Sequence, residues 1–322
     1  MVRTVVVVLF ILVASRSFGQ GSSNPFFFTP LNIENGLSQQ TVNAIFQDAD
    51  GYMWFATRNG LNRYDGYEFK IFRKNYRDAH SLCGNEILCI TQDSAKDLWV
   101  GTIEGINRID YETGKIFRYF LPHSNNIQAL YHTSRNELFV FTNEGAWKYN
   151  NQKDSLNWFE FEGLATKTRI RAVVEDLQRH LYLGTTQGIY IYDQNYHLIE
   201  HIPAKSDDPD ALPQGSISFM TVDRSGQIWA VTSFNKVSCW DPIHRKLYTV
   251  EGLTNVRQLL DFDDSTMLVG TFYGLEFLNK HNLKTCRIPM KIGEKGALSH
   301  YSVISLYKDR RDNLGLELIR EE

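Results

Sequence analysis

The sequence predicts an all-β protein: a seven-bladed β-propeller of four-stranded antiparallel blades, with six blades complete and the seventh truncated. Three observations predict this fold class. A sequence repeat recurs in steps of 45, 40, 43, 47 and 39 residues, each copy contains two tight-turn signals, and no stretch has sustained helical periodicity. A period near 40–45 residues with four short strand patterns per period is typical of a propeller blade.

The fixed points of the repeat are an aromatic residue, an Asp and a Thr. Trp54, Trp99 and Trp229 each follow an Asp by six residues and precede a Thr by three. Three more copies have Phe139, Tyr182 and Leu268 at the tryptophan position. A single blade cannot bury its two apolar faces, so we expect these residues to fill the core between neighbouring blades. The Asp is expected in a turn, and the Thr is expected to bond to the backbone near the next turn.

The first copy illustrates the elements of one blade in order. Residues 42–46 form a short apolar strand, and the Asp-Ala-Asp-Gly segment 48–51 is a turn. Residues 52–57 form an aromatic-rich strand, which ends at the second turn, 58–60. Residues 61–64 and 67–71 alternate apolar and polar side chains, as half-buried strands do. In the same frame, blades begin near residues 42, 87, 127, 170, 217 and 256, with a partial blade from 303.

The seventh copy loses the repeat. Six residues after Asp309, the aromatic residue is replaced by Gly315, and the sequence ends seven residues later. We therefore expect an unfilled gap between blades one and six, with a closing contribution from a strand near residues 26–31. One hypothesis is that a frameshift has produced the N-terminal piece of a longer gene product.

The N-terminus has the pattern of a secretory signal peptide. Arg3 precedes an apolar run over residues 5–14, and Ser17 and Gly19 place small residues before a cut at position 19. We expect residues 1–19 to be removed, residues 20–322 to form the single incomplete propeller domain, and the protein to be periplasmic. The alternative is an uncleaved membrane anchor, but the run is shorter than the roughly 20 residues that span a bilayer.

Composition excludes several classes. The chain has 322 residues, is 43% hydrophobic and 22% charged, and is therefore too apolar for a disordered protein. Its formal net charge of −3 gives no electrostatic reason to expect nucleic-acid binding. The four cysteines have no zinc or redox spacing, and we expect no cofactor and no metal. A disulfide between Cys83 and Cys89 is one possibility, and the other is that Cys89 is a small apolar strand residue.

The segment from Gly36 to Phe69, GLSQQTVNAIFQDADGYMWFATRNGLNRYDGYEF, resembles a known repeat family. It is similar to the two-component regulator propeller repeats, the periplasmic sensor region of Bacteroidetes hybrid histidine kinase/response regulator proteins. The resemblance covers roughly residues 26–313. It implies an oligosaccharide ligand, control of polysaccharide-utilisation genes, and homodimers among intact relatives. The kinase, the regulator and the membrane helix of those relatives are missing from this chain, so the resemblance implies a truncated fragment.

Candidate ligand contacts lie in loops, because a rigid scaffold commonly presents recognition residues there. The turns between second and third strands share one face of a propeller with the segments that link blades. The candidates on that face are Arg58, Asn59, Glu104, Asn143, Gln187, Asn235, Tyr273 and, in a linking segment, Arg169. Their amides, arginines and aromatic ring suit a sugar, and Arg58 would match the anionic group of an acidic glycan.

Two other functions are compatible with the sequence. A propeller glycosidase would need two non-repeating carboxylates, and Asp207, Asp208 and Asp210 in one long loop are non-repeating. A secreted interaction scaffold is the second alternative. The sequence contains none of the common hydrolase, metalloprotease or nucleotide-binding motifs, so we expect a chain that is not an enzyme and has no catalytic residues.

Overall fold

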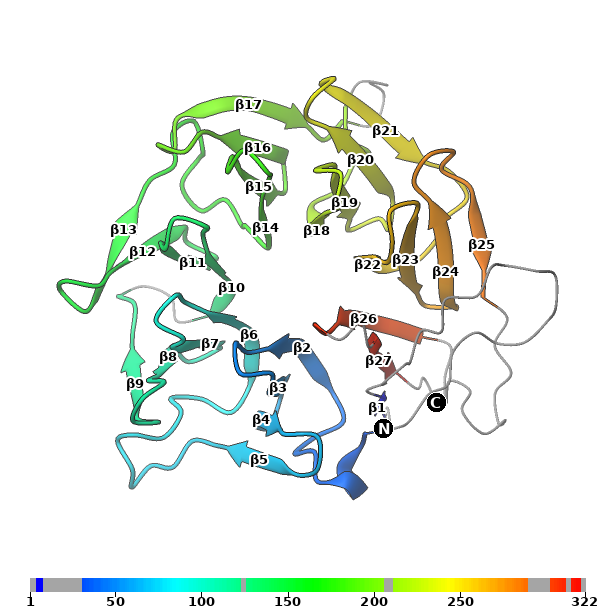
Figure 1. Ribbon diagram of the computed structural model, residues 1–322. Coiled ribbons are helices and arrows are strands. Elements are labelled where there is room, and N and C mark those ends of the chain that lie inside the picture. Colours follow the sequence, from blue (N-terminus) through cyan, green and yellow to red (C-terminus); the bar gives the residue numbers. More distant parts are fainter. Residues whose placement is uncertain are drawn as a thin grey trace.

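The computed structural model describes residues 4–7, 31–122, 126–205, 211–288, 302–310 and 314–319. Within these residues, β-strands form six four-stranded antiparallel sheets, each in simple up-and-down order. The sheets stand around a central axis with their first strands innermost, as the blades of a β-propeller (Figure 1). The predicted all-β propeller of four-stranded antiparallel blades is therefore confirmed.

The blades follow the sequence repeat closely. Blade 1 is β2 (Val42–Gln47), β3 (Met53–Thr57), β4 (Gly60–Tyr64) and β5 (Phe69–Phe72). Blade 2 is β6 (Ile87–Gln92), β7 (Leu98–Thr102), β8 (Ile106–Ile109) and β9 (Ile116–Tyr119). Blade 3 is β10 (Ile127–His132), β11 (Leu138–Thr142), β12 (Ala146–Asn150) and β13 (Ser155–Phe159).

The second half of the ring is built in the same way. Blade 4 is β14 (Ala172–Glu175), β15 (Leu181–Thr185), β16 (Gly188–Tyr192) and β17 (Leu198–Pro203). Blade 5 is β18 (Ile217–Val222), β19 (Ile228–Thr232), β20 (Val237–Asp241) and β21 (Lys246–Val250). Blade 6 is β22 (Val256–Asp261), β23 (Thr266–Thr271), β24 (Gly274–Asn279) and β25 (Thr285–Arg287). Five blades begin at the expected residue, and blade 4 begins at 172 rather than 170.

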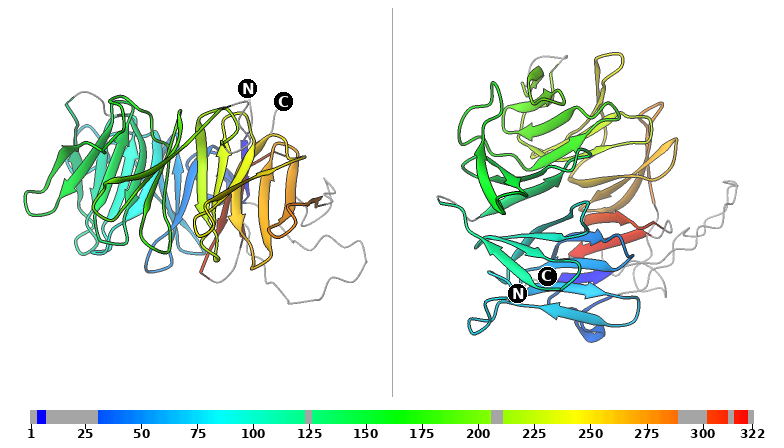
Figure 2. Two further views of the ribbon diagram at one scale, coloured as in Figure 1. Left: turned by 90° about the horizontal axis from the view of Figure 1, so that it is seen from above. Right: turned by 60° about the vertical axis from the view of Figure 1, so that its left-hand side comes forward.

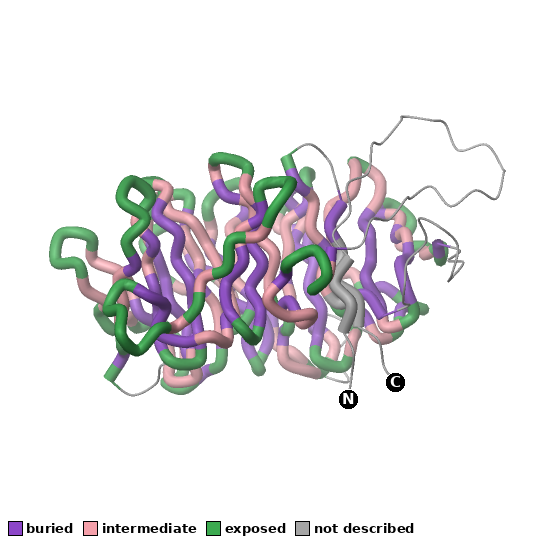
Figure 3. Tube along the Cα trace, turned by 90° about the horizontal axis from the view of Figure 1, so that it is seen from below, coloured by how far each residue is buried: buried purple, intermediate pink, exposed green. Residues whose placement is uncertain are grey.

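Aromatic residues at the fixed repeat position fill the space between blades. Trp99 and Trp229 are completely buried, and Trp54 is 5% exposed. Trp99 of blade 2 packs with Ile127 and Val140 of blade 3, and the other two tryptophans make equivalent contacts with the blade that follows them. Buried residues accordingly occupy the middle of the ring's height, with exposed residues at the turns (Figure 3). The predicted inter-blade core is confirmed.

Positive-φ residues make the tight turns possible. Gly60, in the β3–β4 turn, has a φ of 117°, and a Cβ there would lie 2.7 Å from the carbonyl oxygen of Phe72. Five copies of the repeat have Gly at this position, whereas blade 5 has Asn235. Asn235 adopts a φ of 60°, in the left-handed region that Asn tolerates better than most residues.

A seventh, three-stranded sheet lies between blade 6 and blade 1 (Figure 1). It consists, from the centre outward, of β26 (Ser302–Lys308), β27 (Leu314–Ile319) and β1 (Thr4–Val7), and we call it the closing sheet. β26 lies next to β22 on one side and β2 on the other. The pairing of β26 with β27 has a bulge between Val303 and Ser305. In five of the complete blades, the pairing of the first strand with the second has a bulge at the equivalent place.

The structure here differs from two expectations. β27 continues to Ile319, and Gly315 pairs with Tyr307 just as Trp54 pairs with Phe46 in blade 1. Because strand pairing depends on backbone hydrogen bonds, loss of the consensus aromatic residue does not end the strand. The gap expected between blades one and six is occupied by the closing sheet. Of the closing strand expected near residues 26–31, all but Leu31 lies outside the described residues.

β1 lies in the segment predicted to be a signal peptide. It pairs antiparallel with β27, from Thr4 opposite Ile319 to Val7 opposite Leu316. Removal of residues 1–19 would take this partner away from β27, so the state of the N-terminus decides how many strands the closing sheet has. Cleavage of a signal peptide remains a prediction.

One kind of hydrogen bond joins neighbouring blades. The donor is the backbone N–H of the residue after the Asp or Thr that begins the turn between a blade's first and second strands. The acceptor is the side chain of the last residue in the first strand of the next blade. The bonds run from Ala49 to Gln92 Oε1 (2.7 Å), Ser134 to Glu175 Oε2 (2.6 Å), Arg224 to Asp261 Oδ2 (3.2 Å) and Arg310 to Gln47 Oε1 (3.0 Å). We call these bonds the clasp. The last one joins the closing sheet to blade 1, so the ring closes with the contact that also joins complete blades.

All four cysteines are free thiols. Cys83 and Cys89 therefore do not form the disulfide that the sequence left open. Cys89 packs with the core between blades 2 and 3 and would touch any Cβ placed on Gly101. Burial raises the pKa of its thiol to about 12, which agrees with the alternative interpretation of a small apolar strand residue.

Candidate functional site

The turns between second and third strands lie on the same side of the ring as the segments that connect blades, because successive strands alternate in direction. We call this side the rim face and the other side the turn face; Figure 2 shows the ring edge-on, with turns along both sides. Hydrogen bonds tie turns to connecting segments on the rim face. The N–H of Gly60 bonds to the carbonyl of Asn85 (2.8 Å), and that of Lys167 bonds to the carbonyl of Glu144 (3.2 Å).

All eight predicted ligand-contact residues lie on the rim face. Seven are in turns: Arg58 and Asn59 in β3–β4, Glu104 in β7–β8, Asn143 in β11–β12, Gln187 in β15–β16, Asn235 in β19–β20 and Tyr273 in β23–β24. Arg169 precedes β14, and its Nε donates to Asn143 Oδ1 at 3.1 Å. The structure thus brings Arg169 and Asn143 together and distributes the others around the ring. Their role in binding remains a prediction.

The repeated Thr builds these turns. Thr57 Oγ1 donates to the carbonyl of Gly60 (2.7 Å) and accepts the N–H of Asn59 (3.1 Å). Thr102, Thr142, Thr185 and Thr271 make the same pair of bonds in their blades. The predicted hydroxyl-to-backbone bond is confirmed. In these five turns, the Thr hydroxyl fixes the backbone of one variable residue at the tip: Asn59, Glu104, Glu144, Gln187 and Tyr273.

Ion pairs neutralise several charges of the rim face. Arg58 Nε lies 3.9 Å from Glu86 Oε1, and Lys167 Nζ lies 3.8 Å from Glu144 Oε2. Lys74 Nζ donates to Glu104 Oε2 at 2.5 Å, and this hydrogen bond raises the pKa of Lys74. Arg58, the residue predicted to match an acidic glycan, therefore already has a carboxylate beside it.

Two buried asparagines on the rim face were missed by the sequence analysis. Asn62 Oδ1 accepts the N–H of Ser38 (2.8 Å), and Asn107 Oδ1 accepts the N–H of Cys83 (2.8 Å). Both asparagines are completely buried, and both fix the segment that leads into their blade. The signal was present in the sequence, because Gly-Leu-Asn-Arg at 60–63 recurs as Gly-Ile-Asn-Arg at 105–108.

Blade 5 shows why this asparagine is not universal. Pro213 occupies the position of Ser38 and has no N–H to donate. Ser238 occupies the position of Asn62, and its buried hydroxyl has no hydrogen-bond partner among the described residues. Loss of the donor thus coincides with loss of the acceptor amide.

The repeated aspartates of the turn face are structural. Asp48 Oδ2 accepts from Trp54 Nε1 (2.7 Å), while Oδ1 accepts the N–H groups of Asp50 and Tyr52 (both 3.0 Å). Asp93, Asp176 and Asp223 make corresponding bonds to Trp99, Tyr182 and Trp229. The predicted turn role is confirmed: each Asp closes its turn and fixes the aromatic residue of the core.

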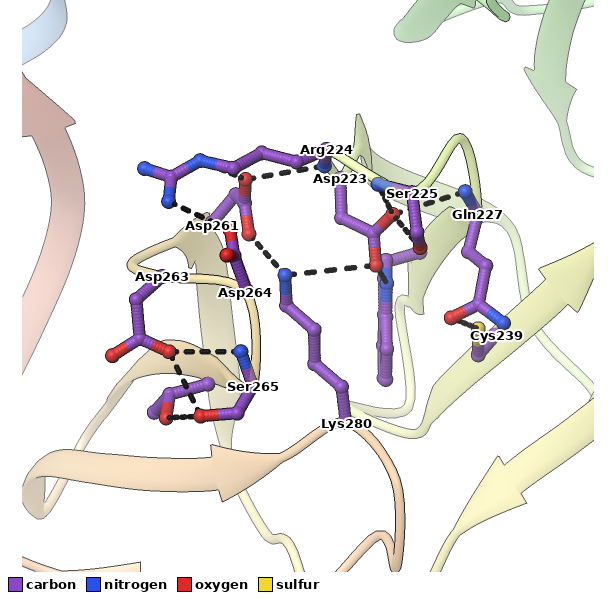
Figure 4. A network of polar contacts seen from close by, with 12 residues as sticks. Asp223, Arg224, Ser225, Gln227, Cys239, Asp261, Asp263, Asp264, Ser265 and Lys280 are labelled. Atoms are coloured by element: carbon purple, nitrogen blue, oxygen red, sulfur yellow. Dashed lines mark hydrogen bonds and ion pairs between the residues drawn. The ribbon is translucent and has the colours of Figure 1, made fainter.

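A buried ionic network on the turn face joins blades 5 and 6 (Figure 4). Lys280, whose side chain is 4% exposed, bonds to Asp261 and lies 3.8 Å from Asp223 Oδ2. Arg224 Nε approaches the other oxygen of Asp261 at 3.3 Å. Cys239 lines a cavity of about 400 Å³ beside the network. Because each cation faces a carboxylate, the network is better suited to holding blades together than to presenting charge.

A groove of about 560 Å³ lies between β13, the outer strand of blade 3, and the β16–β17 turn of blade 4. Trp158 and Tyr196 line it together with Glu160. Trp158 is 41% exposed, meets Trp147 edge-on at 5.3 Å and lies against Gly145. This groove adjoins the rim face at Gly145 and does not include the eight predicted residues.

The glycosidase alternative gains no support from the structure. Its candidate carboxylates, Asp207, Asp208 and Asp210, lie outside the described residues. Across the described ranges, no cluster of three or more His, Cys, Asp or Glu side chains is arranged to hold a metal ion. The same part of the chain contains no helix of the length and hydropathy that crossing a membrane requires.

Comparison with protein families decides what the repeat is. The family described as two component regulator propeller matches residues 36–59 and 81–104. These segments cover the connecting segment, the first two strands and the following turn in blades 1 and 2. These two segments match two-component regulator propeller repeats.

A curated relative is a histidine kinase. A histidine kinase of Formosa agariphila is 44% identical over 77 residues, which are 24% of this chain and 5% of the kinase. The match thus spans a small part of a much longer protein.

Solved structures show the same fold. The extracellular domain of a putative hybrid two-component system from B. thetaiotaomicron has a TM-score of 0.74 at 21% identity, covering 91% of this chain and 41% of that one. A streptogramin B lyase has a TM-score of 0.63 at 12% identity, covering 88% of this chain and 95% of that one. PorZ of Porphyromonas gingivalis has a TM-score of 0.61 at 17% identity, covering 77% of this chain and 41% of that one. This propeller therefore shares its architecture with proteins of several functions, and its own function has to be argued from its residues.

Proposed function

We propose that this regulator propeller is the ligand-sensing part of a two-component signalling system and that its ligand is an oligosaccharide. The observation that carries the proposal is the rim face. There, one repeated device, the Thr-anchored turn, presents an Asn, Glu, Gln or Tyr side chain from five of the six complete blades. A rigid scaffold with varied, exposed tips is the usual arrangement for recognition by loops. Amide, arginine and tyrosine side chains suit sugar hydroxyls and sugar ring faces.

The proposal extends to the architecture. We infer that the closing sheet takes the place of a seventh blade. The bulge in β26, the Gly315–Tyr307 pairing and the clasp from Arg310 to Gln47 all reproduce blade features. A closed ring holds the rim-face turns in fixed positions relative to each other, which a sensor needs if ligand binding is to favour one state.

The proposal also covers where the protein is located and what it does to its ligand. We infer a periplasmic location, which the predicted signal peptide and the likeness to an extracellular sensor domain support. The propeller binds its ligand without transforming it. The repeated aspartates are already occupied with turn hydrogen bonds, and Lys280 with its carboxylates, so these groups are not poised for catalysis.

Calorimetry and a glycan array on the purified chain test this function. We expect saturable binding of at least one oligosaccharide class, with no release of reducing sugar. Robust turnover of a bound polysaccharide would replace the sensor proposal with the glycosidase. N-terminal sequencing of protein secreted into the periplasm tests the location; an intact residue 1 would contradict the cleaved signal peptide.

A further inference from the structure

We propose that the rim face binds the anionic group of its ligand through Arg169 and Arg171, so that the oligosaccharide recognised is acidic. This inference rests on the proposed function and adds the chemical class of the ligand. The class is a sugar chain bearing carboxylate or sulfate groups. Both groups offer the oxygen pairs that a guanidinium binds with two parallel hydrogen bonds.

The first argument is the composition of the innermost strands at the rim. In five blades a bulge leaves the second residue of the innermost strand out of the pairing with the next strand. Arg171 holds the equivalent position in blade 4, just before β14. A bulge redirects a side chain away from the ladder. The six described positions are Asn43, Leu88, Gln128, Arg171, Ser218 and Arg257. Two are arginines and none is acidic, although acidic residues outnumber basic ones in the whole chain.

The second argument is the surroundings of the two neighbouring arginines. Arg169 and Arg171 are both exposed and flank Ile170, which is buried. Their partners are amides: Asn143 Oδ1 accepts from Arg169 Nε (3.1 Å), and Gln128 Oε1 accepts from Arg171 Nε (3.4 Å). An amide orients a guanidinium but does not neutralise it. Burial and, next, the positive charge of Arg169 lower the pKa of Arg171, as expected for like charges held close together.

The third argument is the distribution of carboxylates. Three acidic residues of the rim face are already paired, namely Glu86 with Arg58, Glu104 with Lys74 and Glu144 with Lys167. Within the described part of the chain, no carboxylate lies within ion-pair distance of Arg169, Arg171 or Arg257. Arg257 instead stacks on the ring of Phe272, at 4.3 Å from its centroid. The rim face therefore carries guanidinium groups whose charge the described protein leaves unmatched.

These features predict which ligand the site prefers. A bound carboxylate or sulfate would relieve the repulsion between the two arginines and gain charge-assisted hydrogen bonds, whereas a neutral sugar would gain only ordinary ones. Binding through surface charges also weakens as salt rises, because ions screen the attraction.

The experiment measures calorimetric binding of matched oligosaccharides to the purified chain. A galacturonic acid hexamer is compared with a neutral galactose hexamer, and a κ-carrageenan hexasaccharide with its desulfated form. The first pair tests for a carboxylate and the second for a sulfate. The variants are R169Q, R171Q and the control R245Q, an exposed arginine of the β20–β21 turn on the turn face that pairs with Glu200. Thermal unfolding of each variant verifies that the fold is unchanged.

We expect at least one acidic hexamer to bind, its neutral counterpart to bind at least about tenfold more weakly, and added salt to weaken the acidic one. We expect R169Q and R171Q each to weaken binding about tenfold and R245Q to leave it unchanged. Equal binding of the acidic and neutral members of both pairs would overturn the anionic class but leave the sensor proposal intact. Acidic binding that survives both variants would overturn the assignment to these arginines. If no oligosaccharide of either kind binds, both proposals fail.

Discussion

The two faces of this propeller are built from the same repeat, but they differ in which of its residues recur from blade to blade. On the turn face, the same side chain makes the same bond in four of the six blades: an Asp caps the turn and accepts a hydrogen bond from the indole or phenol of the core. On the rim face, the anchoring Thr repeats but the residue at the tip changes from Asn to Glu, Gln or Tyr. Repetition therefore marks what holds the ring together, and variation marks the side chains that we propose contact the ligand.

The charges of the two faces differ in the same way. On the turn face Lys280 and Arg224 are matched by carboxylates from two blades. On the rim face some cations are matched, but Arg169 and Arg171 contact amides. Three pairs of substitutions and one pH titration can break or sharpen this comparison.

The largest effect is expected from the repeated core. Replacing Trp99 by Ala leaves a cavity between blades 2 and 3 and should lower the free energy of unfolding by about 3–5 kcal/mol. Urea denaturation measures the change. The matched control is Trp158→Ala, because Trp158 is 41% exposed and lies outside the repeat. Equal losses in the two variants would contradict the assignment of the repeated aromatic residue to the core.

The repeated Asp of the turn face comes next. Asp93 accepts hydrogen bonds from Trp99 Nε1 (2.7 Å) and from the N–H of Asp97 (3.0 Å). Asp93→Ala leaves these buried donors unpaired and should cost about 1–3 kcal/mol of unfolding free energy. Asn143→Ala in a rim-face turn should cost less than about 0.5 kcal/mol. A rim-face loss as large as the turn-face loss would mean that the variable residues of these turns are structural too.

Acidification should weaken the interface between blades 3 and 4. Burial by itself would raise the pKa of Glu137, but hydrogen bonds from Lys148 and Tyr196 outweigh it and hold the pKa below its ordinary value of 4.5. A carboxyl whose folded pKa is depressed stabilises the fold above its unfolded pKa, and this contribution is lost as pH falls through the folded pKa.

Unfolding free energies of the wild type and Glu137→Gln, measured from about pH 6 to about pH 3, test this expectation. The wild type should be the more stable at pH 6, and the difference should shrink below about pH 4.5. A difference that stays constant would show that the charge of Glu137 does not contribute.

The smallest effect tests ring closure. Gln47→Ala removes the acceptor for Arg310, and Gln92→Ala removes the equivalent acceptor for Ala49. Each should lower the free energy of unfolding by about 0.5–1.5 kcal/mol. Similar losses would sharpen the comparison by placing the closing sheet among the structural, repeated parts. A loss in Gln92→Ala alone would mean that the closing sheet does not join blade 1 in solution.

Much of the fold could be predicted because its signals are local. The Asp-to-Trp bond spans six residues and the Thr-to-Gly bond spans three, so each leaves a fixed spacing in the sequence. The same spacing placed the eight candidate residues on one face. It overlooked Asn62 and Asn107, whose partners lie 24 residues earlier, although the recurring Gly-Leu/Ile-Asn-Arg segments were visible.

The sequence by itself determined the six complete blades, the turn chemistry and the buried aromatic positions, since these follow from short-range periodicity and from the need of each blade to cover its faces. Tertiary structure alone decided which charges are matched. Glu86 neutralises Arg58, whereas Arg169 and Arg171 meet amides from blade 3. It also decided closure, because Arg310 reaches Gln47 across 263 residues. Such contacts depend on where the ring brings distant segments, and the spacing of residues along the chain does not encode that.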